Sequence, residues 1–208
     1  MRILNLYAGI GGSRRHWSDK HEITAVELDP LTARVYQHYF PDDTVVVGDA
    51  HQYLLDHFNE FDFIWASPPC PTHSRLNTSL HVQGVIRYPD MSLYQEIIFL
   101  KQWHKGKWAI ENVIPYYAVL IQPRAEIERH LFWSNFAIPA TKFADIGIRI
   151  GGNLPSETAD MEAKLGIKLP DFVPPRRGRL MLRDITRPEI GAHILKAAMK
   201  TTIQTALL

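Results

Sequence analysis

The sequence is poor in cysteine and has no long hydrophobic run. Cys70 is the single cysteine among 208 residues, which argues against an internal disulfide and a cysteine-based metal site. No segment approaches the length of a transmembrane helix. The chain starts directly in the strand-like run Met1-Arg2-Ile3-Leu4-Asn5-Leu6, so no signal peptide is expected. These features predict a cytoplasmic protein without a membrane span or a metal.

An excess of charge of one sign is also lacking. The 23 basic and 22 acidic residues leave a net charge of +1, so the whole chain carries no electrostatic signature of nucleic-acid binding. The basic residues nevertheless cluster, early at Arg14, Arg15 and His16 and late at Arg176, Arg177, Arg179, Arg183 and Arg187. A hydrophobic content of 46% predicts one folded core with a small appendage.

Short apolar runs alternate with helical segments over most of the chain. Strands are predicted at residues 2–7, 23–26, 45–47, 61–66, 108–110 and 129–136. Helices are predicted at residues 31–39, 51–58, 92–103 and 188–207. The alternation predicts an α/β fold with a doubly wound, mostly parallel sheet. Residues 75–90 are predicted to be a loop and residues 137–182 an irregular region.

Two of the helices have an apolar face that should lie on the sheet. In the segment 92–103 this face holds Leu93, Ile97, Leu100 and Trp103. In the last helix it holds Ile194, Leu195, Ala198 and Ile203.

The lone cysteine lies in the stretch Ser67-Pro68-Pro69-Cys70-Pro71, directly after an apolar strand. A Pro-Pro pair cannot continue a sheet, so the chain must leave the sheet there in a stiff turn. Cys70 is therefore presented at the carboxyl end of a strand, where open α/β sheets place their ligands and chemistry. The alternative is a buried structural thiol that behaves as a small hydrophobe.

Glycines and acids follow the first three predicted strands. The loop Ala8-Gly9-Ile10-Gly11-Gly12 precedes Ser13, a possible helix N-cap, as at the start of a nucleotide-binding βα unit. A plain tight turn is the alternative. Glu27 and Asp29 follow the second strand, where such folds place a carboxylate on ribose hydroxyls, although Asp29 before Pro30 also suits a helix cap. Asp49 follows the third strand.

Another carboxylate, Glu111, ends the predicted strand at residues 108–110 and begins the sequence Glu111-Asn112-Val113. A buried carboxyl near the Cys70 turn would favour its protonated form and could donate a proton. The alternative is an ordinary hydrogen-bonded carboxylate at a strand end.

Together these motifs resemble the cytosine-C5 DNA methyltransferase family. Leu6 to Gly12 is similar to its first, cofactor-binding motif, and Glu27 and Asp49 match its second- and third-strand acids. Ser67-Pro68-Pro69-Cys70 resembles its Pro-Cys motif and Glu111-Asn112-Val113 its Glu-Asn-Val motif. Pro188-Glu189-Ile190-Gly191 and the stretch from Arg129 to Phe136 resemble small phage and prophage members. The resemblance covers residues 2–136 well and 183–200 loosely.

The sequence departs from the family pattern at three places. Pro71 stands where the family usually has Gln, a residue without a chemical part in the reaction. The usual Arg-x-Arg pair is reduced to Arg129, which is followed by His130-Leu131. The first-motif aromatic is Tyr7 instead of Phe, and it should still stack on an adenine ring.

The resemblance implies S-adenosylmethionine as the methyl donor, S-adenosylhomocysteine as the product and double-stranded DNA as the substrate. Cys70 would be the nucleophile, Glu111 the proton donor to the base and Arg129 the cation near its O2. The implied cofactor contacts are Tyr7, Ala8, Gly9, Gly11, Gly12, Glu27, Leu28, Asp49, Ala50 and Pro68. The target cytosine must be flipped out of the duplex. The expected nucleic-acid contacts are Ser74, Arg75, Arg87, Arg176, Arg177 and Arg179.

This interpretation divides the chain into a catalytic and cofactor-binding part (residues 1–136), a reduced target-recognition region (137–182) and a C-terminal helix returning to the catalytic part (183–208). It predicts a monomer in solution. It also predicts a small methyltransferase of the phage or prophage type with a role in restriction-modification.

Three other functions are compatible with parts of the pattern. Related tRNA cytosine-C5 enzymes share these motifs, so an RNA substrate is the nearest alternative. An idle cofactor- or DNA-binding relative would explain Pro71 and the incomplete arginine pair, although intact Cys70 and Glu111 argue against it. A dinucleotide oxidoreductase would need Gly-x-Gly-x-x-Gly, which Arg14 interrupts.

Overall fold

The computed structural model describes residues 1–147 and 156–200. Its strands are β1 (Arg2–Leu6), β2 (Glu22–Glu27), β3 (Thr44–Val47), β4 (Phe63–Ala66), β5 (Lys107–Val113), β6 (Ala125–Ile127) and β7 (His130–Ser134). Its helices are α1 (Pro30–Tyr39), α2 (Ala50–His57), α3 (Leu76–Val82), α4 (Ser92–Trp103), α5 (Ser156–Leu165), α6 (Pro175–Arg183) and α7 (Pro188–Lys200), with short 3-10 turns η1 (Ser13–His16) and η2 (Phe58–Glu60).

The strands form one sheet in the order β3-β2-β1-β4-β5-β7-β6. The strands β3, β2, β1, β4 and β5 pair in parallel, whereas β7 pairs antiparallel with both β5 and β6. The order reverses between β1 and β4, so the connections that leave their adjacent carboxyl ends run in opposite directions, and this is where open α/β sheets bind ligands. The predicted α/β fold with a mostly parallel sheet is confirmed.

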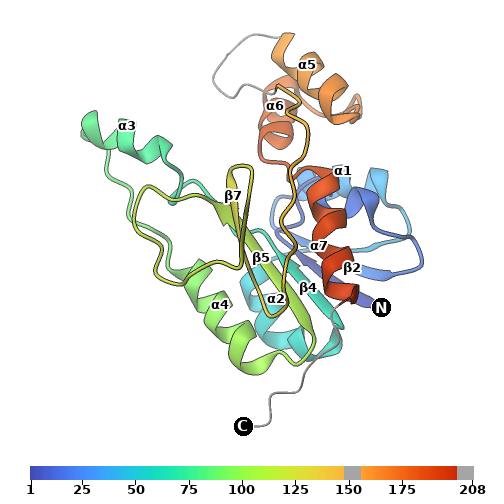
Figure 1. Ribbon diagram of the computed structural model, residues 1–208. Coiled ribbons are helices and arrows are strands. Elements are labelled where there is room, and N and C mark those ends of the chain that lie inside the picture. Colours follow the sequence, from blue (N-terminus) through green and yellow to red (C-terminus); the bar gives the residue numbers. More distant parts are fainter. Residues whose placement is uncertain (148–155, 201–208) are drawn as a thin grey trace.

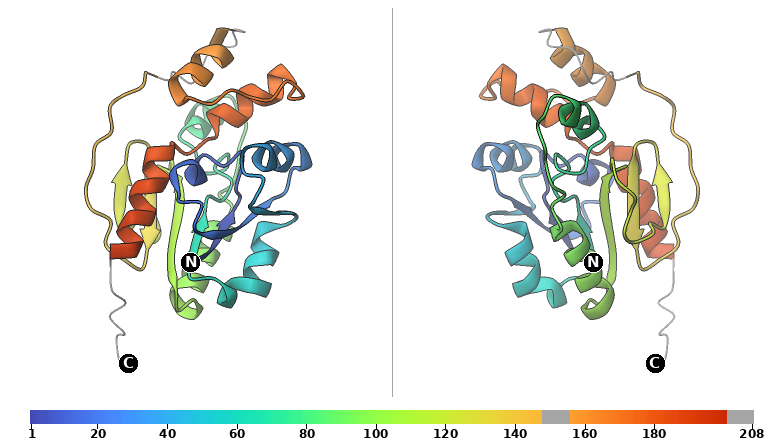
Figure 2. Two further views of the ribbon diagram at one scale, coloured as in Figure 1. Left: turned by 90° about the vertical axis from the view of Figure 1, so that its right-hand side faces the viewer. Right: turned by 90° about the vertical axis from the view of Figure 1, so that its left-hand side faces the viewer.

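Helices cover both faces of this sheet (Figures 1 and 2). On one face Leu54 of α2 and Leu93, Ile97 and Leu100 of α4 are buried in a cluster with Leu4 of β1. On the other face Ile190 and Ile194 of α7 are buried with Ile3 of β1 and Trp65 of β4. Period-2 alternation along the strands separates these two sets, as a two-layered core requires.

Helix α7 also lies directly on the glycine loop that follows β1. A Cβ atom on Gly191 would lie 2.1 Å from the Ser13 carbonyl oxygen, and one on Gly12 would lie 2.2 Å from the Ile185 side chain. A Cβ on Gly11 would meet the Phe40 ring. Gly12 and Gly191 thus allow backbone contact with Thr186 and Ser13, and Gly11 leaves room for the Phe40 ring.

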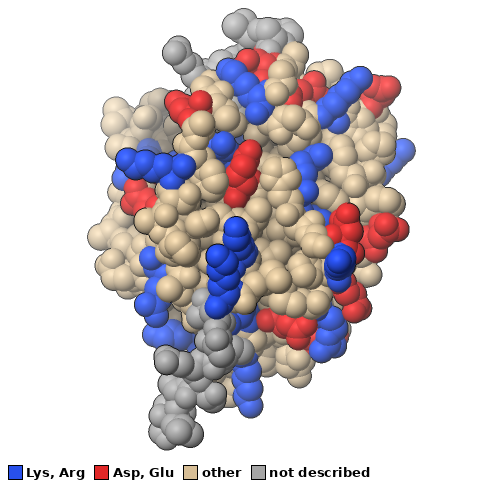
Figure 3. Space-filling view, turned by 45° about the vertical axis from the view of Figure 1, so that its right-hand side comes forward, with Lys and Arg blue, Asp and Glu red and all other residues tan. Residues whose placement is uncertain are grey.

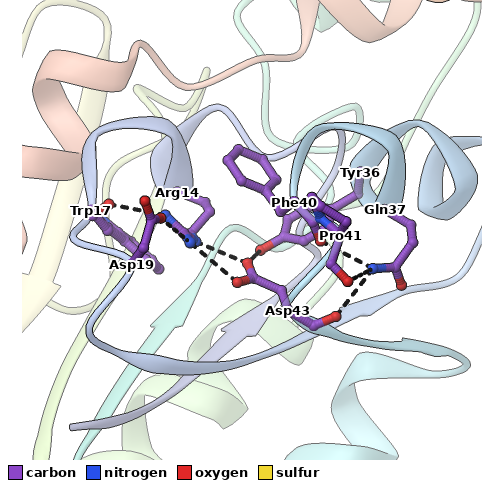
Figure 4. A network of polar contacts seen from close by, with 8 residues as sticks. All are labelled: Arg14, Trp17, Asp19, Tyr36, Gln37, Phe40, Pro41 and Asp43. Atoms are coloured by element: carbon purple, nitrogen blue, oxygen red, sulfur yellow. Dashed lines mark hydrogen bonds and ion pairs between the residues drawn. The ribbon is translucent and has the colours of Figure 1, made fainter.

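A buried ion pair fixes the exit of the same loop (Figure 4). Arg14 is 3% exposed, and its Nε and Nη2 donate to the two carboxylate oxygens of Asp43 at 2.8 and 3.1 Å. The Tyr36 hydroxyl donates to the same carboxylate at 2.8 Å. Because a buried charge is costly without a hydrogen-bonded partner, this pairing assigns Arg14 to the structure and removes it from the exposed basic cluster.

Several local predictions are wrong. The predicted loop 75–90 contains α3, and the predicted irregular region 137–182 contains α5 and α6. Strand β6 was not predicted. Ser13 is not a helix N-cap, because Gly12 holds that position without a side-chain bond.

The predicted helix at residues 92–103 is confirmed as α4, but Trp103 is 61% exposed and does not face the sheet. The last helix is described as far as Lys200, so the expected contact of Ile203 lies outside the described residues.

Helices α5 and α6 pack against the glycine loop that follows β1. Met161 of α5 and Met181 and Leu182 of α6 are buried in one cluster with Ile10 of the glycine loop and Val35 of α1. The segment 137–182 therefore shares a core with the first βα unit.

Candidate active site

The Cys70 turn is held on both sides by buried hydrogen bonds. The Cys70 carbonyl accepts from the backbone N–H groups of His73 and Ser74, both at 3.0 Å, which closes a tight turn behind the thiol. On the strand side, the Asn112 amide donates to the Pro68 carbonyl at 3.0 Å. Asn112 is 1% exposed, so it ties the Pro-Pro segment firmly to β5.

Glu111 lies at the carboxyl end of the neighbouring strand. Strands β4 and β5 pair in parallel with Ala66 opposite Ile110, so Glu111 and the Cys70 turn leave the same edge of the sheet. The Glu111 side chain is buried and accepts from the Thr186 hydroxyl at 3.3 Å. His130 Nε2 lies 3.6 Å from the other carboxylate oxygen.

The thiol of Cys70 is partly buried among charges of both signs. Burial raises its pKa to about 11, and the negative charges of Asp184 and Glu111 contribute to that rise. Arg129 acts in the opposite direction. Glu111 and Arg129 therefore both lie within electrostatic range of the Cys70 thiol.

Asp184, Thr186 and His130 are site residues that the sequence did not predict. Asp184 lies at the end of α6, and burial raises its pKa while Arg183 and Arg129 oppose the rise. The Arg183-Asp184-Ile185-Thr186 stretch precedes α7, and no sequence motif in it indicates a catalytic or binding role. Its proximity to Cys70 and Glu111 depends on the chain returning through α6.

Arg129 is at the turn between β6 and β7, and its side chain is exposed. Its Nη2 donates to the Arg183 carbonyl at 3.3 Å. Arg129 and His130 line a pocket of about 360 Å³ together with Glu128, Phe143, Asp145, Ile146, Leu165, Leu182, Arg183, Ile185 and Arg187.

The carboxyl ends of β1, β2 and β3 form a second part of the site. Glu27 accepts the backbone N–H groups of Gly9 at 2.9 Å and Asp29 at 3.0 Å. Asp49 caps α2 by accepting from the backbone of His51 and Gln52, and Asp29 caps α1 at Thr32. Hydrogen bonds to the helix N-termini thus already occupy part of the Asp29 and Asp49 carboxylates.

Two glycines on this edge leave open space beside the backbone. A Cβ atom on Gly9, whose φ is +55°, or on Gly48 would meet no other atom within 4 Å. Ala8 and Ala50 are buried, whereas Leu28 is 70% exposed beside Glu27. Open backbone, an aromatic side chain at Tyr7 and acids at two strand ends fit a nucleoside-containing cofactor.

A family model describes this arrangement. The model of the C-5 cytosine-specific DNA methylase family matches residues 1–113, which include the glycine loop, the Cys70 turn and Glu111. The chain belongs to this family. Both the family and the fold imply S-adenosylmethionine as the cofactor.

Curated relatives with matching segments are tRNA (cytosine(38)-C(5))-methyltransferases. The human protein is 27% identical over 103 residues, which is 41% of this chain and 26% of that protein. The mouse protein is 30% identical over 104 residues, 47% of this chain and 24% of that protein. The matched region thus spans only about a quarter of the length of either relative.

Two solved structures share the fold over most of the chain. A mutant of DNMT2 from Spodoptera frugiperda superimposes with a TM-score of 0.61 and 13% identity, covering 96% of this chain and 99% of that chain. The methyltransferase EhMeth from Entamoeba histolytica gives a TM-score of 0.59 and 9% identity, with coverage of 96% and 98%.

The residues expected to contact nucleic acid in this family member form two groups. Ser74, Arg75 and Arg87 lie on the segment containing α3, which extends away from the sheet (Figure 1). Arg176, Arg177 and Arg179 lie on α6, on the other side of the carboxyl edge in the same view.

The arginines of α6 differ in their partners. Arg177 is paired with Asp29, and Arg179 lies 3.3 Å from Glu157 of α5. Arg176 is exposed. Part of the basic cluster on α6 therefore holds this helix against α1 and α5.

In the described part of the chain, no group of three or more His, Cys, Asp or Glu side chains is arranged to hold a metal ion. Within the same ranges, no helix is long and apolar enough to cross a membrane.

The raised pKa of Cys70 predicts low reactivity of the free thiol. Because the thiolate is the nucleophile, a rise of the pKa from 9.0 to about 11 lowers the thiolate fraction near pH 8 about 100-fold. We expect alkylation by iodoacetamide to be slowed by about that factor relative to the unfolded chain, and to accelerate with rising pH up to about 11. Mass spectrometry of the Cys70 peptide measures the rate. A half-maximal rate near pH 8.5 would contradict the described environment.

Proposed function

We propose that this protein methylates C5 of cytosine in DNA through a covalent bond between Cys70 and C6 of the base. The observation that carries the proposal is the placement of Cys70 and Glu111 at the same edge of two paired strands. The Asn112–Pro68 hydrogen bond joins these two motifs and supports a fixed geometry.

The chemistry follows from the weak nucleophilicity of cytosine C5. Addition of the Cys70 thiolate to C6 gives an enamine-like ring whose C5 is nucleophilic. Glu111, in its protonated form, hydrogen-bonds N3 and spreads the developing negative charge. Arg129 stabilises the charge at O2. S-adenosylmethionine, when bound, supplies the electrophilic methyl group. Loss of the C5 proton to solvent and elimination of Cys70 as the thiolate then give the aromatic, C5-methylated base and free the sulfur.

The surroundings of Cys70 require activation of the thiol. Its raised pKa keeps the proton on sulfur at neutral pH, so thiolate formation must accompany substrate binding. Arg129 is the cation that favours the thiolate. Entry of a base beside Arg129 and Glu111 would change the balance of charges that acts on sulfur.

Cofactor binding is assigned to the edge formed by β1, β2 and β3. Backbone groups from Ala8 to Gly12 would hold the methionine part, Glu27 the ribose hydroxyls and Asp49 the adenine amine. Tyr7 would stack on the adenine. The open space beside Gly9 and Gly48 supports this placement.

The flipped cytosine requires a protein surface on both sides of Cys70. The α3 segment, with Arg75 and Arg87, and helix α6, with Arg176, are the two candidate surfaces. Because the net charge of the chain is only +1, binding would depend on these local contacts and not on a uniform positive field. Basic and acidic side chains are interspersed on the face shown in Figure 3.

Transfer RNA is the second candidate substrate, because the curated relatives named above are tRNA methyltransferases. Their matches cover 41% and 47% of this chain but only about a quarter of their own length. The shared chemistry of Cys70 would be the same on either nucleic acid.

A covalent trap distinguishes these substrates. The protein is incubated with S-adenosylmethionine and either duplex DNA containing 5-fluorocytosine or a tRNA transcript containing 5-fluorocytidine. Fluorine at C5 blocks the final proton loss, so Cys70 stays bound to the base. We expect a band that survives denaturation on DNA and needs S-adenosylmethionine.

A band on the tRNA alone would transfer the proposal to RNA. The absence of a band on either substrate, with S-adenosylmethionine binding intact, would favour an idle cofactor-binding relative.

A further inference from the structure

A buried carboxylate outside the motifs described above lies beside the cofactor part of the site. Glu96 of α4 is 0% exposed. One of its oxygens, Oε1, accepts from the Tyr7 hydroxyl at 2.5 Å and lies 3.1 Å from His51 Nδ1. A buried carboxylate is costly unless its hydrogen bonds compensate for lost hydration. A carboxylate at this position therefore suggests a function beyond packing.

The first partner, Tyr7, has an unusual backbone. Its φ of 54° lies in the left-handed region, which costs a non-glycine residue free energy. Alternation along β1 would place Tyr7 on the same face as Ile3 and Asn5, yet its ring packs with the α2 and α4 cluster. The left-handed turn at the end of β1 therefore directs the ring toward Glu96, and the hydroxyl contact holds it there.

The second partner, His51, lies in the first turn of α2. It follows Asp49 and Ala50, which the family resemblance assigns to the cofactor. Through a single oxygen, Glu96 thus connects the end of β1, the start of α2 and the middle of α4. The first two of these positions border the open space beside Gly9 and Gly48.

The Glu96 carboxylate is only partly satisfied by hydrogen bonds, and further negative charge lies near its partner Tyr7. Among the described residues, its Oε2 is buried and has no hydrogen-bond partner. Asp49 and Asp90 add negative charge around Tyr7. Burial raises the pKa of Glu96, and the contacts with Tyr7 and His51 oppose this rise. A purely structural carboxylate would gain more from full pairing than from this incomplete arrangement.

We propose that Glu96 is a positioning residue for S-adenosylmethionine. It fixes the Tyr7 ring at the end of β1 and the His51 ring at the start of α2, the two positions that border the cofactor. The inference rests on the proposed function, because it takes its ligand from there. Glu96 acts through its two partners and needs no contact with the cofactor.

The test measures cofactor affinity in four variants by isothermal titration calorimetry with S-adenosylmethionine. Glu96→Gln keeps the size of the side chain but weakens its acceptance of two hydrogen bonds, and we expect about tenfold weaker binding. Tyr7→Phe removes only the hydroxyl and should weaken binding by a similar factor. The double variant should be no weaker than Glu96→Gln, since both changes break one linkage. Gln95→Ala, an exposed neighbour on α4, is the control and should bind like the parent.

The pH dependence separates positioning from a general structural role. The ionised carboxylate accepts from both partners, and its protonated form accepts less well. Affinity of the parent should therefore weaken as the pH falls from 8 through the titration of Glu96, and the profile of Glu96→Gln should be flat by comparison. A variant that is merely less stable would keep the profile of the parent in its folded fraction.

The outcomes are distinct. Failure of the parent to bind S-adenosylmethionine would overturn the proposed function and the inference with it. Binding by the parent together with equal binding by folded Glu96→Gln and Tyr7→Phe would overturn the inference alone. If Glu96→Gln does not fold, normal affinity and an unchanged pH profile in Tyr7→Phe would overturn it.

Discussion

Replacing Cys70 by serine is expected to abolish methyl transfer while S-adenosylmethionine still binds as in the parent. Serine keeps the shape of the turn, and the carbonyl of residue 70 can still accept from His73 and Ser74. A serine hydroxyl is a far weaker nucleophile than a thiolate, so covalent addition to C6 stops. Loss of a nucleophile costs on the order of 10⁴-fold or more in kcat.

The measurement combines transfer of a labelled methyl group with calorimetry of cofactor binding. Thr78→Ser, an exposed substitution on α3, is the control for a substitution close to the Cys70 turn, and it should keep the activity of the parent. Activity of Cys70→Ser equal to that of the parent would exclude a covalent mechanism. Loss of cofactor binding together with activity would instead indicate that Cys70 has a structural role in the cofactor site.

Replacing Glu111 by glutamine is expected to reduce methyl transfer and to increase thiol reactivity. The amide can still accept from Thr186, but it cannot supply a proton to N3, and kcat should fall about 10²–10³-fold. Because the negative charge of Glu111 contributes to the raised pKa of Cys70, its removal lowers that pKa. More thiolate is then present near pH 8, and alkylation of Cys70 should accelerate.

A fall in kcat together with faster alkylation of Cys70 distinguishes this prediction from a general loss of function. General loss of structure could also accelerate alkylation, so circular dichroism and cofactor binding must stay as in the parent. Glu126→Gln, an exposed carboxylate change on β6, should alter neither rate. A Glu111→Gln variant with parental kcat would remove Glu111 from the reaction, whatever its effect on the thiol.

Local patterns were sufficient to predict the first βα units and the Cys70 turn. Short apolar runs bounded by turn residues carry the signal for buried strands, and β1 to β5 lie where it predicted them. The Pro-Pro pair and Glu111 each follow a strand, so their placement at the carboxyl edge required only the parallel sheet. The family assignment depends on the same ordered motifs.

The missed helices had conflicting local signals. Pro175 is at the start of α6, where proline suits a helix because its missing N–H needs no partner. A Pro-Pro pair such as Pro174-Pro175 is equally typical of a break in regular structure. Helix α3 contains Asn77, Thr78 and Ser79, which have modest helix propensity, and the Asn77 amide helps to hold it by donating to the Pro71 and Ser74 carbonyls.

The sequence by itself determined the motifs at the ends of the first five strands, because strand periodicity and turn chemistry act within a few residues. Only the tertiary structure decided which distant groups surround them. Asp184 and Thr186 reach Cys70 and Glu111 through the return of the chain from α6, and Glu96 meets Tyr7 across the layer between α4 and β1. Such contacts arise from packing between segments far apart in the chain, and packing leaves no local pattern at either residue.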